Sequence, residues 1–313
     1  MIKKPKIILI TGPTATGKTA LGALLAKTSG GEVVSADSMQ IYKFMDIGTA
    51  KPTEEEKLGV PHHMLDIVPP WENYSVSRYV SDAVVCIDDI LRRGKLPILV
   101  GGTGLYIESL LSGRGFSARG ETALRSELER KYDDIGGEVM LKMLYAFDSE
   151  SAAKLHANDK KRIVRAFEVF ETTGMTISQH DRETKALPPR YDVTKIALSF
   201  SDRSVLYRHI NNRVDSMLHL GLEREVRNLL DMGVRPDCTS MQAIGYKEMT
   251  GAILGKYDVS DATDIIKTES RRLAKRQLTW LRRDLSFKWF LWDTAPDIER
   301  CVNEMRNSEL IKQ

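Results

Sequence analysis

The chain has 313 residues, of which 42% are hydrophobic and 28% are charged, the composition of an ordinary globular protein with about two domains. Its formal net charge of +3 is too small to identify a nucleic-acid binder by itself. Its apolar runs are far shorter than the roughly 20 residues that span a bilayer, so we expect no membrane segment, no secretory peptide and a cytoplasmic location. The three cysteines Cys86, Cys238 and Cys301 are widely scattered, which excludes a disulfide framework and a Cys-x-x-Cys zinc site.

Short apolar runs rich in β-forming residues predict the strands Ile7–Thr11, Glu32–Ala36, Pro97–Val100, Lys195–Phe200 and Lys288–Trp292. Helical patterns lie between them. In Ser75–Arg93, for example, apolar residues recur about every 3.6 positions after an expected N-cap at Ser75. Because strands alternate with helices, we predict an α/β fold with a parallel sheet of about five strands, covered on both faces.

Residues 116–190 separate the third and fourth predicted strands and form a charged block with no strand pattern. Helical patterns within this block cover Leu124–Lys131, Val139–Ala146 and Lys160–Thr172. We therefore expect a helical insertion domain at 116–190, within a core made of residues 1–115 and 191–313.

Two more helical segments, Ser204–Met232 and Asp261–Arg283, are expected in the last part of the chain. From Lys267 to Lys288 the net charge is +6, so this stretch is strongly basic in a nearly neutral chain. A face of this kind fits binding to nucleic-acid phosphates, although a solvated helix surface shows the same pattern. The cations at helical spacing are Arg271, Arg272, Lys275, Arg276 and Arg282.

The segment after the first strand matches the phosphate-loop pattern G-x-x-x-x-G-K-[ST] at every fixed position. Its glycines let successive backbone N–H groups converge on phosphate oxygens, and the following helix adds the positive end of its dipole. Lys18 supplies a cation and Thr19 a hydroxyl for Mg²⁺. The motif predicts a P-loop NTPase-like core that binds a di- or triphosphate through Gly12, Pro13, Thr14, Ala15, Thr16, Gly17, Lys18 and Thr19.

Polar residues follow two other predicted strands, at the edge where open parallel sheets bind ligands. The carboxylate of Asp37 could hold Mg²⁺ through water, accept a proton from a nucleophile, or cap a turn. Thr103 lies among three glycines, which fit either ligand binding or close packing. The usual acidic Mg²⁺ ligand of an ATPase is missing after the strand Pro97–Val100.

Further motifs occur in order along the chain: DSMQIY at 37–42, MDIGTAKP at 45–52, HHMLD at 62–66, GGTGLY at 101–106, AIGYK at 243–247 and KRQLTWLR at 275–282. Together with the phosphate loop, they resemble the tRNA dimethylallyltransferases (tRNA isopentenyltransferases). These enzymes belong to the P-loop superfamily and bind an isoprenoid diphosphate in place of ATP. Only Cys301 follows the last predicted strand, so the chain resembles a bacterial-type member without the zinc finger of eukaryotic members.

The resemblance implies transfer of a dimethylallyl group from dimethylallyl diphosphate to N6 of the adenosine just 3′ of the anticodon, in tRNAs that read codons beginning with U. The products are an isopentenyladenosine and diphosphate. By the same resemblance, Asp37 takes the proton of the amine and Thr103 forms a hydrogen bond near it. Lys18, Mg²⁺ on Thr19 and an arginine of the helix after strand four neutralise the leaving diphosphate. Position suggests Arg213 for that arginine, or Arg208.

The reacting adenosine must be flipped out of the anticodon loop to reach a residue inside a crevice. The resemblance also implies that one monomer binds the tRNA anticodon stem-loop without help from a membrane. The expected tRNA contacts are Asp37, Ser38, Met39, Gln40, Thr103, Arg125, Lys161, Arg162, Ile163, Val164, Arg165, Gln242, Ala243, Ile244, Gly245, Tyr246, Lys247, Lys275, Arg276, Gln277, Leu278, Thr279, Trp280, Leu281 and Arg282.

Two other classes of function remain open on the phosphate loop and the basic helix alone. A small-molecule P-loop kinase would use the insertion as a lid and would turn over ATP. An NTP-regulated RNA-binding protein without enzymatic activity would bind tRNA and leave its adenosines unchanged.

Overall fold

The computed structural model describes residues 4–113, 122–185 and 188–308. The chain divides into two compact units: unit 1 contains Met1–Leu110 and Tyr191–Gln313, and unit 2 contains Leu111–Arg190. The boundary expected between residues 115 and 116 lies outside the described residues. Within the described ranges, no helix has both the length and the apolar character needed to cross a membrane.

Unit 1 is built on a parallel six-stranded sheet with the strand order β3-β2-β4-β1-β5-β6. The predicted P-loop-like α/β fold is confirmed, and each of the five predicted strands is present. The sixth, β3, pairs with β2 at the edge; it was not predicted because two polar residues form no strand pattern. The strands are β1 (Lys6–Thr11), β2 (Glu32–Ser35), β3 (His62–His63), β4 (Pro97–Val100), β5 (Asp192–Phe200) and β6 (Lys288–Trp292).

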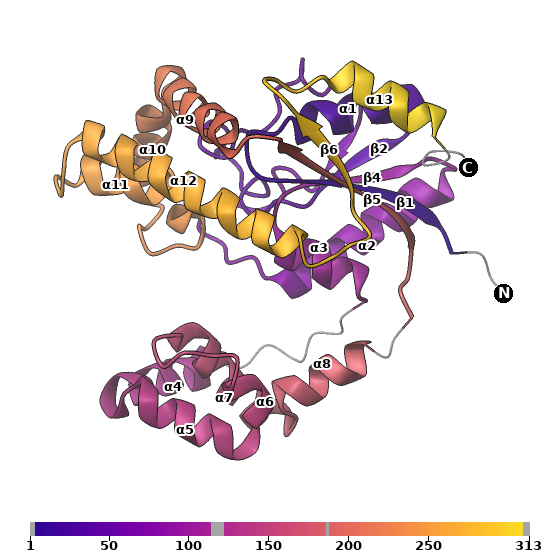
Figure 1. Cartoon of the computed structure of the whole chain (residues 1–313). Coiled ribbons are helices and arrows are strands. Elements are labelled where there is room, and N and C mark those ends of the chain that lie inside the picture. The colour runs from indigo at the N-terminus through magenta and orange to yellow at the C-terminus, as the bar shows by residue number, and fades with distance from the viewer. Residues whose placement is uncertain (1–3, 114–121, 186–187, 309–313) are drawn as a thin grey trace. The chain divides into compact units, whose positions relative to one another are not determined.

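Helices cover both faces of this sheet (Figure 1). On one face, α1 (Lys18–Ser29) packs beside α13 (Ile298–Asn307), and α2 (Val76–Arg92) and α3 (Gly104–Leu111) lie on the other. The Ser75 hydroxyl accepts a hydrogen bond from the backbone N–H of Arg78, so Ser75 is the predicted N-cap of α2. The core between the layers consists of fully buried aliphatic side chains, among them Ile10, Leu21, Ile98 and Leu198.

A second group of helices follows β5 in unit 1. The segment Ser204–Met232, predicted as one helical block, forms two helices because Gly221 ends the first with a φ of 102°, a conformation that suits glycine. The group consists of α9 (Arg203–Leu220), α10 (Leu222–Asp231), the 3-10 helix η1 (Ser240–Gln242), α11 (Tyr246–Ile253) and α12 (Val259–Leu281).

Unit 2 contains α4 (Thr122–Ile135), α5 (Gly137–Phe147), α6 (Ser149–Ala152), α7 (Lys160–Thr173) and α8 (Ile177–Lys185). It has a hydrophobic core of its own, which includes Leu128, Met140, Leu144, Ile163 and Phe167. Each of the three helical patterns read from the sequence of this segment corresponds to a helix.

Candidate active site

The phosphate loop joins β1 to α1 and is held by contacts from inside unit 1. Gly12 has no room for a side chain, since a Cβ there would lie 2.4 Å from the carbonyl oxygen of Leu198. The Thr16 hydroxyl donates to the carbonyl of Pro13 at 2.8 Å, and the carbonyl of Thr16 accepts from the indole N–H of Trp292 at 3.0 Å. These contacts fix the conformation of the loop, and α1 starts directly behind it.

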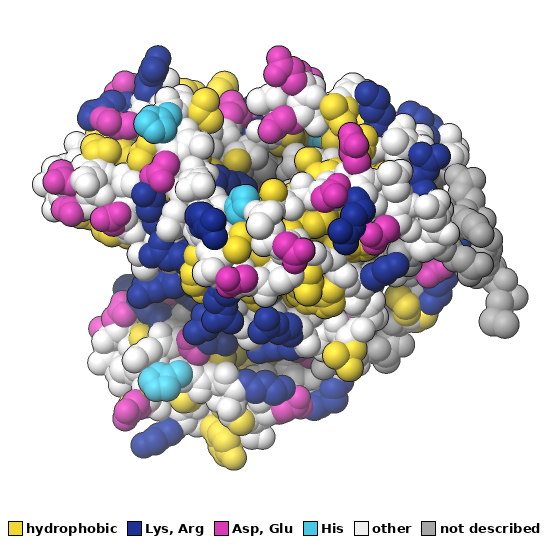
Figure 2. Space-filling model, turned by 45° about the horizontal axis from the view of Figure 1, so that its top comes forward, with side chains coloured by type: hydrophobic (Ala, Val, Ile, Leu, Met, Phe, Trp, Pro, Cys, Tyr) yellow, Lys and Arg dark blue, Asp and Glu magenta, His cyan; other side chains and the backbone are white. Residues whose placement is uncertain are grey.

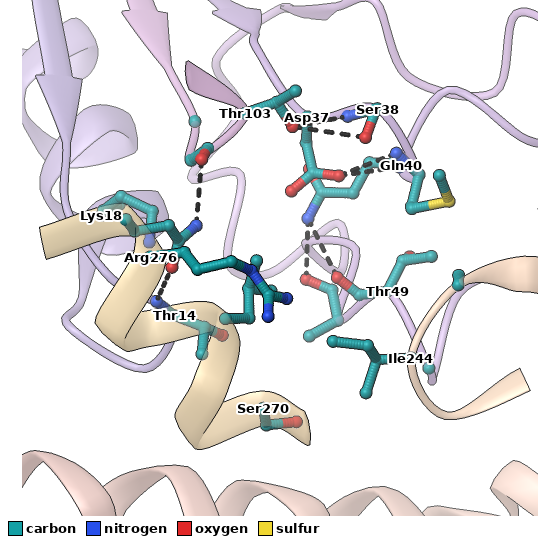
Figure 3. A pocket seen from close by; sticks show the side chains of 18 of the residues that line it. Thr14, Lys18, Asp37, Ser38, Gln40, Thr49, Thr103, Ile244, Ser270 and Arg276 are labelled. Atoms are coloured by element: carbon teal, nitrogen blue, oxygen red, sulfur yellow. Dashed lines mark hydrogen bonds between the residues drawn. The ribbon is translucent and has the colours of Figure 1, made fainter. Parts of the chain in front are cut away.

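A cavity of about 800 Å³ opens beside this loop, within unit 1 (Figure 3). The carboxyl ends of β1, β2 and β4 meet along one edge of the sheet, so the segments that follow these strands converge at the cavity. Its other walls come from α9, α12 and the segment around Ile244. The residues placed there include all four predicted catalytic residues: Lys18, Asp37, Thr103 and Arg213.

Asp37 and Thr103 belong to two strand ends that are joined by hydrogen bonds. The Asp37 Oδ1 atom accepts from the backbone N–H of Met39 at 2.8 Å and of Gln40 at 3.3 Å. The Thr103 hydroxyl oxygen accepts from the backbone N–H of Ser38 at 3.0 Å. Asp37 thus forms the turn-capping bonds that were one interpretation of it, and its side chain also points into the cavity (Figure 3).

Two cations line the cavity close to Asp37. Removal from water, and next the charge of Arg213, lower the pKa of Lys18 to about 7, while the charge of Asp37 raises it. Removal from water also lowers the pKa of Arg213, against the effect of Asp37. An anion bound here would stabilise both charged forms. Arg208, the alternative to Arg213, is exposed on α9.

Most of the apolar wall of the cavity was not recognised as functional in the sequence, where only Ile244 and Trp280 were named, as expected tRNA contacts. Its side chains recur three or four positions apart on α9 and seven positions apart on α12, helical spacings that also predict a packed core. Nothing in the pattern separates a face that packs from a face that lines a cavity. Trp280 is among these residues; the others include Ile210, Val214, Met217, Ile244, Ile266 and Leu273.

Helix α12 has a different environment on each of three sides. Ala274, Leu278 and Leu281 are buried, so the side chains of two expected tRNA contacts, Leu278 and Leu281, face the protein interior. A second side lines the cavity and includes Arg276, Gln277 and Trp280. The third side is exposed and carries Lys275, Thr279 and Arg282.

The cations of α12 do not all belong to one free face. Arg271 donates to the Asn211 side chain at 2.7 Å, and Arg272 forms an ion pair with Glu269 at 2.6 Å. Lys275, Arg276 and Arg282 are exposed. Figure 2 shows Lys and Arg side chains gathered in one area of the face that it draws.

The remaining expected tRNA contacts differ in accessibility. In the segment 242–247, Gln242, Ala243 and Ile244 line the cavity, Tyr246 is buried and Lys247 is exposed. In unit 2, Lys161 and Arg162 are exposed at the start of α7, and Arg125 is exposed on α4 with an ion pair to Glu129. Ile163 and Val164 are fully buried in the core of unit 2, so the side chains of these two expected contacts are not accessible.

Comparisons with known proteins identify the family of the chain. The family model described as IPP transferase matches residues 40–284, and the model described as isopentenyl transferase matches residues 5–66. A tRNA dimethylallyltransferase from Carboxydothermus hydrogenoformans is 47% identical over 286 residues, 91% of each chain. Another from Oceanobacillus iheyensis is 47% identical over 306 residues, which cover 96% of this chain and 97% of the relative.

Solved structures give the same result. The full-length tRNA isopentenylpyrophosphate transferase from Bacillus halodurans has 42% identity and a TM-score of 0.73, over 97% of this chain and 95% of the other. A eukaryotic dimethylallyltransferase acting on tRNA has 30% identity and a TM-score of 0.81, over 99% of this chain and 81% of the other. The chain therefore belongs to the IPP transferase family, the family of the tRNA dimethylallyltransferases.

Proposed function

We propose that the chain transfers the dimethylallyl group of dimethylallyl diphosphate to N6 of the adenosine just 3′ of the anticodon, in tRNAs that read codons beginning with U. One observation carries the proposal: a single cavity joins a phosphate loop, a carboxylate at a strand end and an apolar wall. These three features correspond to the diphosphate, the amine to be deprotonated and the isoprenoid chain. Family membership supports the same activity.

The donor's diphosphate binds the amides of the phosphate loop together with Lys18 and Arg213. Thr19 lines the same cavity, and its hydroxyl is a hard oxygen ligand of the kind that Mg²⁺ prefers. When bound there, Mg²⁺ supplies positive charge to the leaving diphosphate. The isoprenoid chain lies against the apolar wall, where Leu273 and Trp280 exclude water from the allylic carbon.

The acceptor is the exocyclic amine of a flipped-out adenine. The amine is a weak nucleophile because its lone pair is delocalised into the ring. In the reaction N6 forms a bond to the allylic carbon, the bond from that carbon to the diphosphate oxygen breaks, and the N6 proton passes to the Asp37 carboxylate. Thr103 orients the amine, since its hydroxyl lies on the adjoining strand end and is tied to Ser38.

Every residue assigned to the donor and to the adenine belongs to unit 1 of a single chain, so we propose that the monomer is active. We also propose that the protein acts in the cytoplasm. Lys275 and Arg282 on α12 bind phosphates of the anticodon stem-loop, and Arg125, Lys161, Arg162 and Arg165 of unit 2 bind other parts of the tRNA. The neutralised phosphates release counterions, which makes binding salt-dependent.

Mass spectrometry of tRNA nucleosides tests this function. Unmodified tRNA is incubated with the protein, dimethylallyl diphosphate and Mg²⁺, and the expected product is an adenosine that carries one dimethylallyl group. A parallel reaction with ATP and small acceptors tests for a kinase. Phosphoryl transfer without prenylation, or tRNA binding with unchanged nucleosides, would contradict the proposal.

A further inference from the structure

Glu225 of α10 organises a loop that belongs to the cavity, although Glu225 does not line the cavity itself. Its Oε2 atom accepts hydrogen bonds from the backbone N–H groups of Asp46 and Ile47, each at 2.8 Å. Its Oε1 atom accepts from the backbone N–H of Gly48 at 3.1 Å and from the Tyr246 hydroxyl at 2.5 Å. One carboxylate therefore satisfies three successive amides of the loop and fixes the loop to α10 and α11.

The loop so held forms part of the cavity wall. Gly48, Thr49 and Ala50 line the cavity. Gly48 lies against the ring of Tyr246, where an added Cβ would come within 2.4 Å of the ring, so loop and helix are in direct contact. A shift of this turn would therefore change the cavity.

The same loop fixes the side chain of Gln40, which also lines the cavity. The Nε2 atom of Gln40 donates to the carbonyl oxygens of Thr49 at 3.3 Å and of Ala50 at 3.1 Å (Figure 3). Its Oε1 atom accepts from the Ser35 hydroxyl at 3.3 Å. The oxygen and the nitrogen of the Gln40 amide thus both have hydrogen-bond partners. The orientation of the amide depends on where the loop holds the carbonyl groups of Thr49 and Ala50.

We propose that Glu225 is a positioning residue for the acceptor: it holds the loop Asp46–Ala50 and, through two carbonyls of that loop, sets the orientation of the Gln40 amide beside Asp37. This role rests on the proposed function, because it assigns Gln40 and Asp37 to the adenosine side of the cavity. The diphosphate side is formed by the phosphate loop, which none of these hydrogen bonds reaches.

A carboxylate suits this role better than an amide. In Glu225→Gln, one of the two oxygens becomes an NH₂ group, which must face backbone N–H donors. Either the bond from Gly48 or the two bonds from Asp46 and Ile47 are lost, and a donor is left facing another donor. Glu223 offers a matched control, because it lies on the same helix and forms an ion pair with Arg227 at the surface.

The test compares Glu225→Gln with Glu223→Gln in steady-state prenylation of an unmodified anticodon stem-loop RNA. We expect kcat/KM for the RNA to fall about tenfold in Glu225→Gln, the order of one hydrogen bond to a charged group. The KM for dimethylallyl diphosphate should stay within about twofold of the wild-type value, because the phosphate loop is untouched. Tyr246→Phe removes one donor only and should give a smaller loss in the same parameter.

A double-mutant cycle separates positioning from a general loss of stability. If Glu225 acts through Gln40, the loss of kcat/KM in the double variant Glu225→Gln with Gln40→Ala is smaller than the product of the single losses. Multiplicative losses, a KM for dimethylallyl diphosphate that rises about tenfold, or activity of Glu225→Gln equal to that of Glu223→Gln would overturn the role. A wild-type protein that prenylates no RNA would instead contradict the proposed function.

Discussion

The side-chain amide of Gln277 joins α12 to the phosphate loop: its Oε1 atom accepts a hydrogen bond from the backbone N–H of Thr14 at 3.2 Å. Its Nε2 atom donates to the carbonyl oxygen of Gly102 at 3.0 Å. One amide therefore connects three segments. These are α12, which carries the exposed cations, the phosphate loop, which we expect to bind the donor, and the strand end that carries Thr103.

Replacing Gln277 by Ala should weaken donor binding, because the phosphate loop loses an ordering contact. We expect the KM for dimethylallyl diphosphate to rise about fivefold, the worth of roughly one neutral hydrogen bond. Thr279→Ala, on the exposed side of the same helix, should leave this KM unchanged. A Gln277→Ala variant with unchanged or lower KM for the donor would show that the contact does not order the loop.

The pKa of Lys18 predicts how diphosphate binding depends on pH. Because removal from water and Arg213 lower this pKa to about 7, the ammonium of the free protein loses its proton as the pH rises through neutrality. Above that pKa, binding of an anion must first restore the proton, so affinity should fall by up to about tenfold per pH unit.

Titration of inorganic diphosphate between about pH 6 and pH 9 measures this effect. In Lys18→Arg the side chain at this position stays charged over this range. The fall in diphosphate affinity above neutral pH should therefore disappear, and the remaining pH dependence should come from the ionisation of diphosphate itself. Equal profiles for the two proteins would exclude Lys18 as the titrating group.

Asp37→Asn should abolish turnover with little effect on tRNA affinity. The amide oxygen of Asn can still accept the backbone N–H bonds of Met39 and Gln40, so the turn keeps its shape. What is lost is the acceptor for the N6 proton, and general bases typically contribute about 10²–10⁴-fold to rate. Single-turnover prenylation and tRNA binding are the two measurements. Near wild-type transfer would limit Asp37 to a turn-capping role.

Arg276 on α12 and Arg282 at its C-cap are both exposed but should behave differently. Arg282 lies away from the cavity, so Arg282→Gln should flatten the slope of log tRNA affinity against log salt by about 0.7, with the KM for the donor unchanged. Arg276 lines the cavity, so Arg276→Gln should also change kcat or the KM for the donor.

Arg306→Gln on α13 is the control for a lost surface charge, and each variant is compared at equal thermal stability. Unchanged salt slopes in both α12 variants would identify these cations as an ordinary solvated surface.

Sequence patterns predicted the sheet and the residues at its carboxyl edge because both depend on local signals. The apolar strands are short and separated by helices, and the phosphate loop has a fixed spacing with glycines at Gly12 and Gly17. The edge strand His62–His63 gave no such signal, since it has only two residues and both are polar.

Contacts between distant segments could not be predicted from the sequence. Glu225 and Gly48 are 177 positions apart, and Thr14 and Gln277 are 263 positions apart. The apolar wall could not be predicted for another reason. Val214 and Leu273 have the helical spacing of core residues, and only the tertiary structure shows that they line a cavity.

The central claim is that this cavity alkylates an exocyclic amine with a dimethylallyl group. The most direct measurement follows diphosphate release and label transfer from labelled dimethylallyl diphosphate with two anticodon stem-loops. One has adenosine next to the anticodon, and the other has purine riboside there, which lacks only the amine. We predict equal amounts of diphosphate and labelled RNA with adenosine, and neither with purine riboside. Label on the purine stem-loop, or diphosphate release that does not depend on the amine, would contradict the claim.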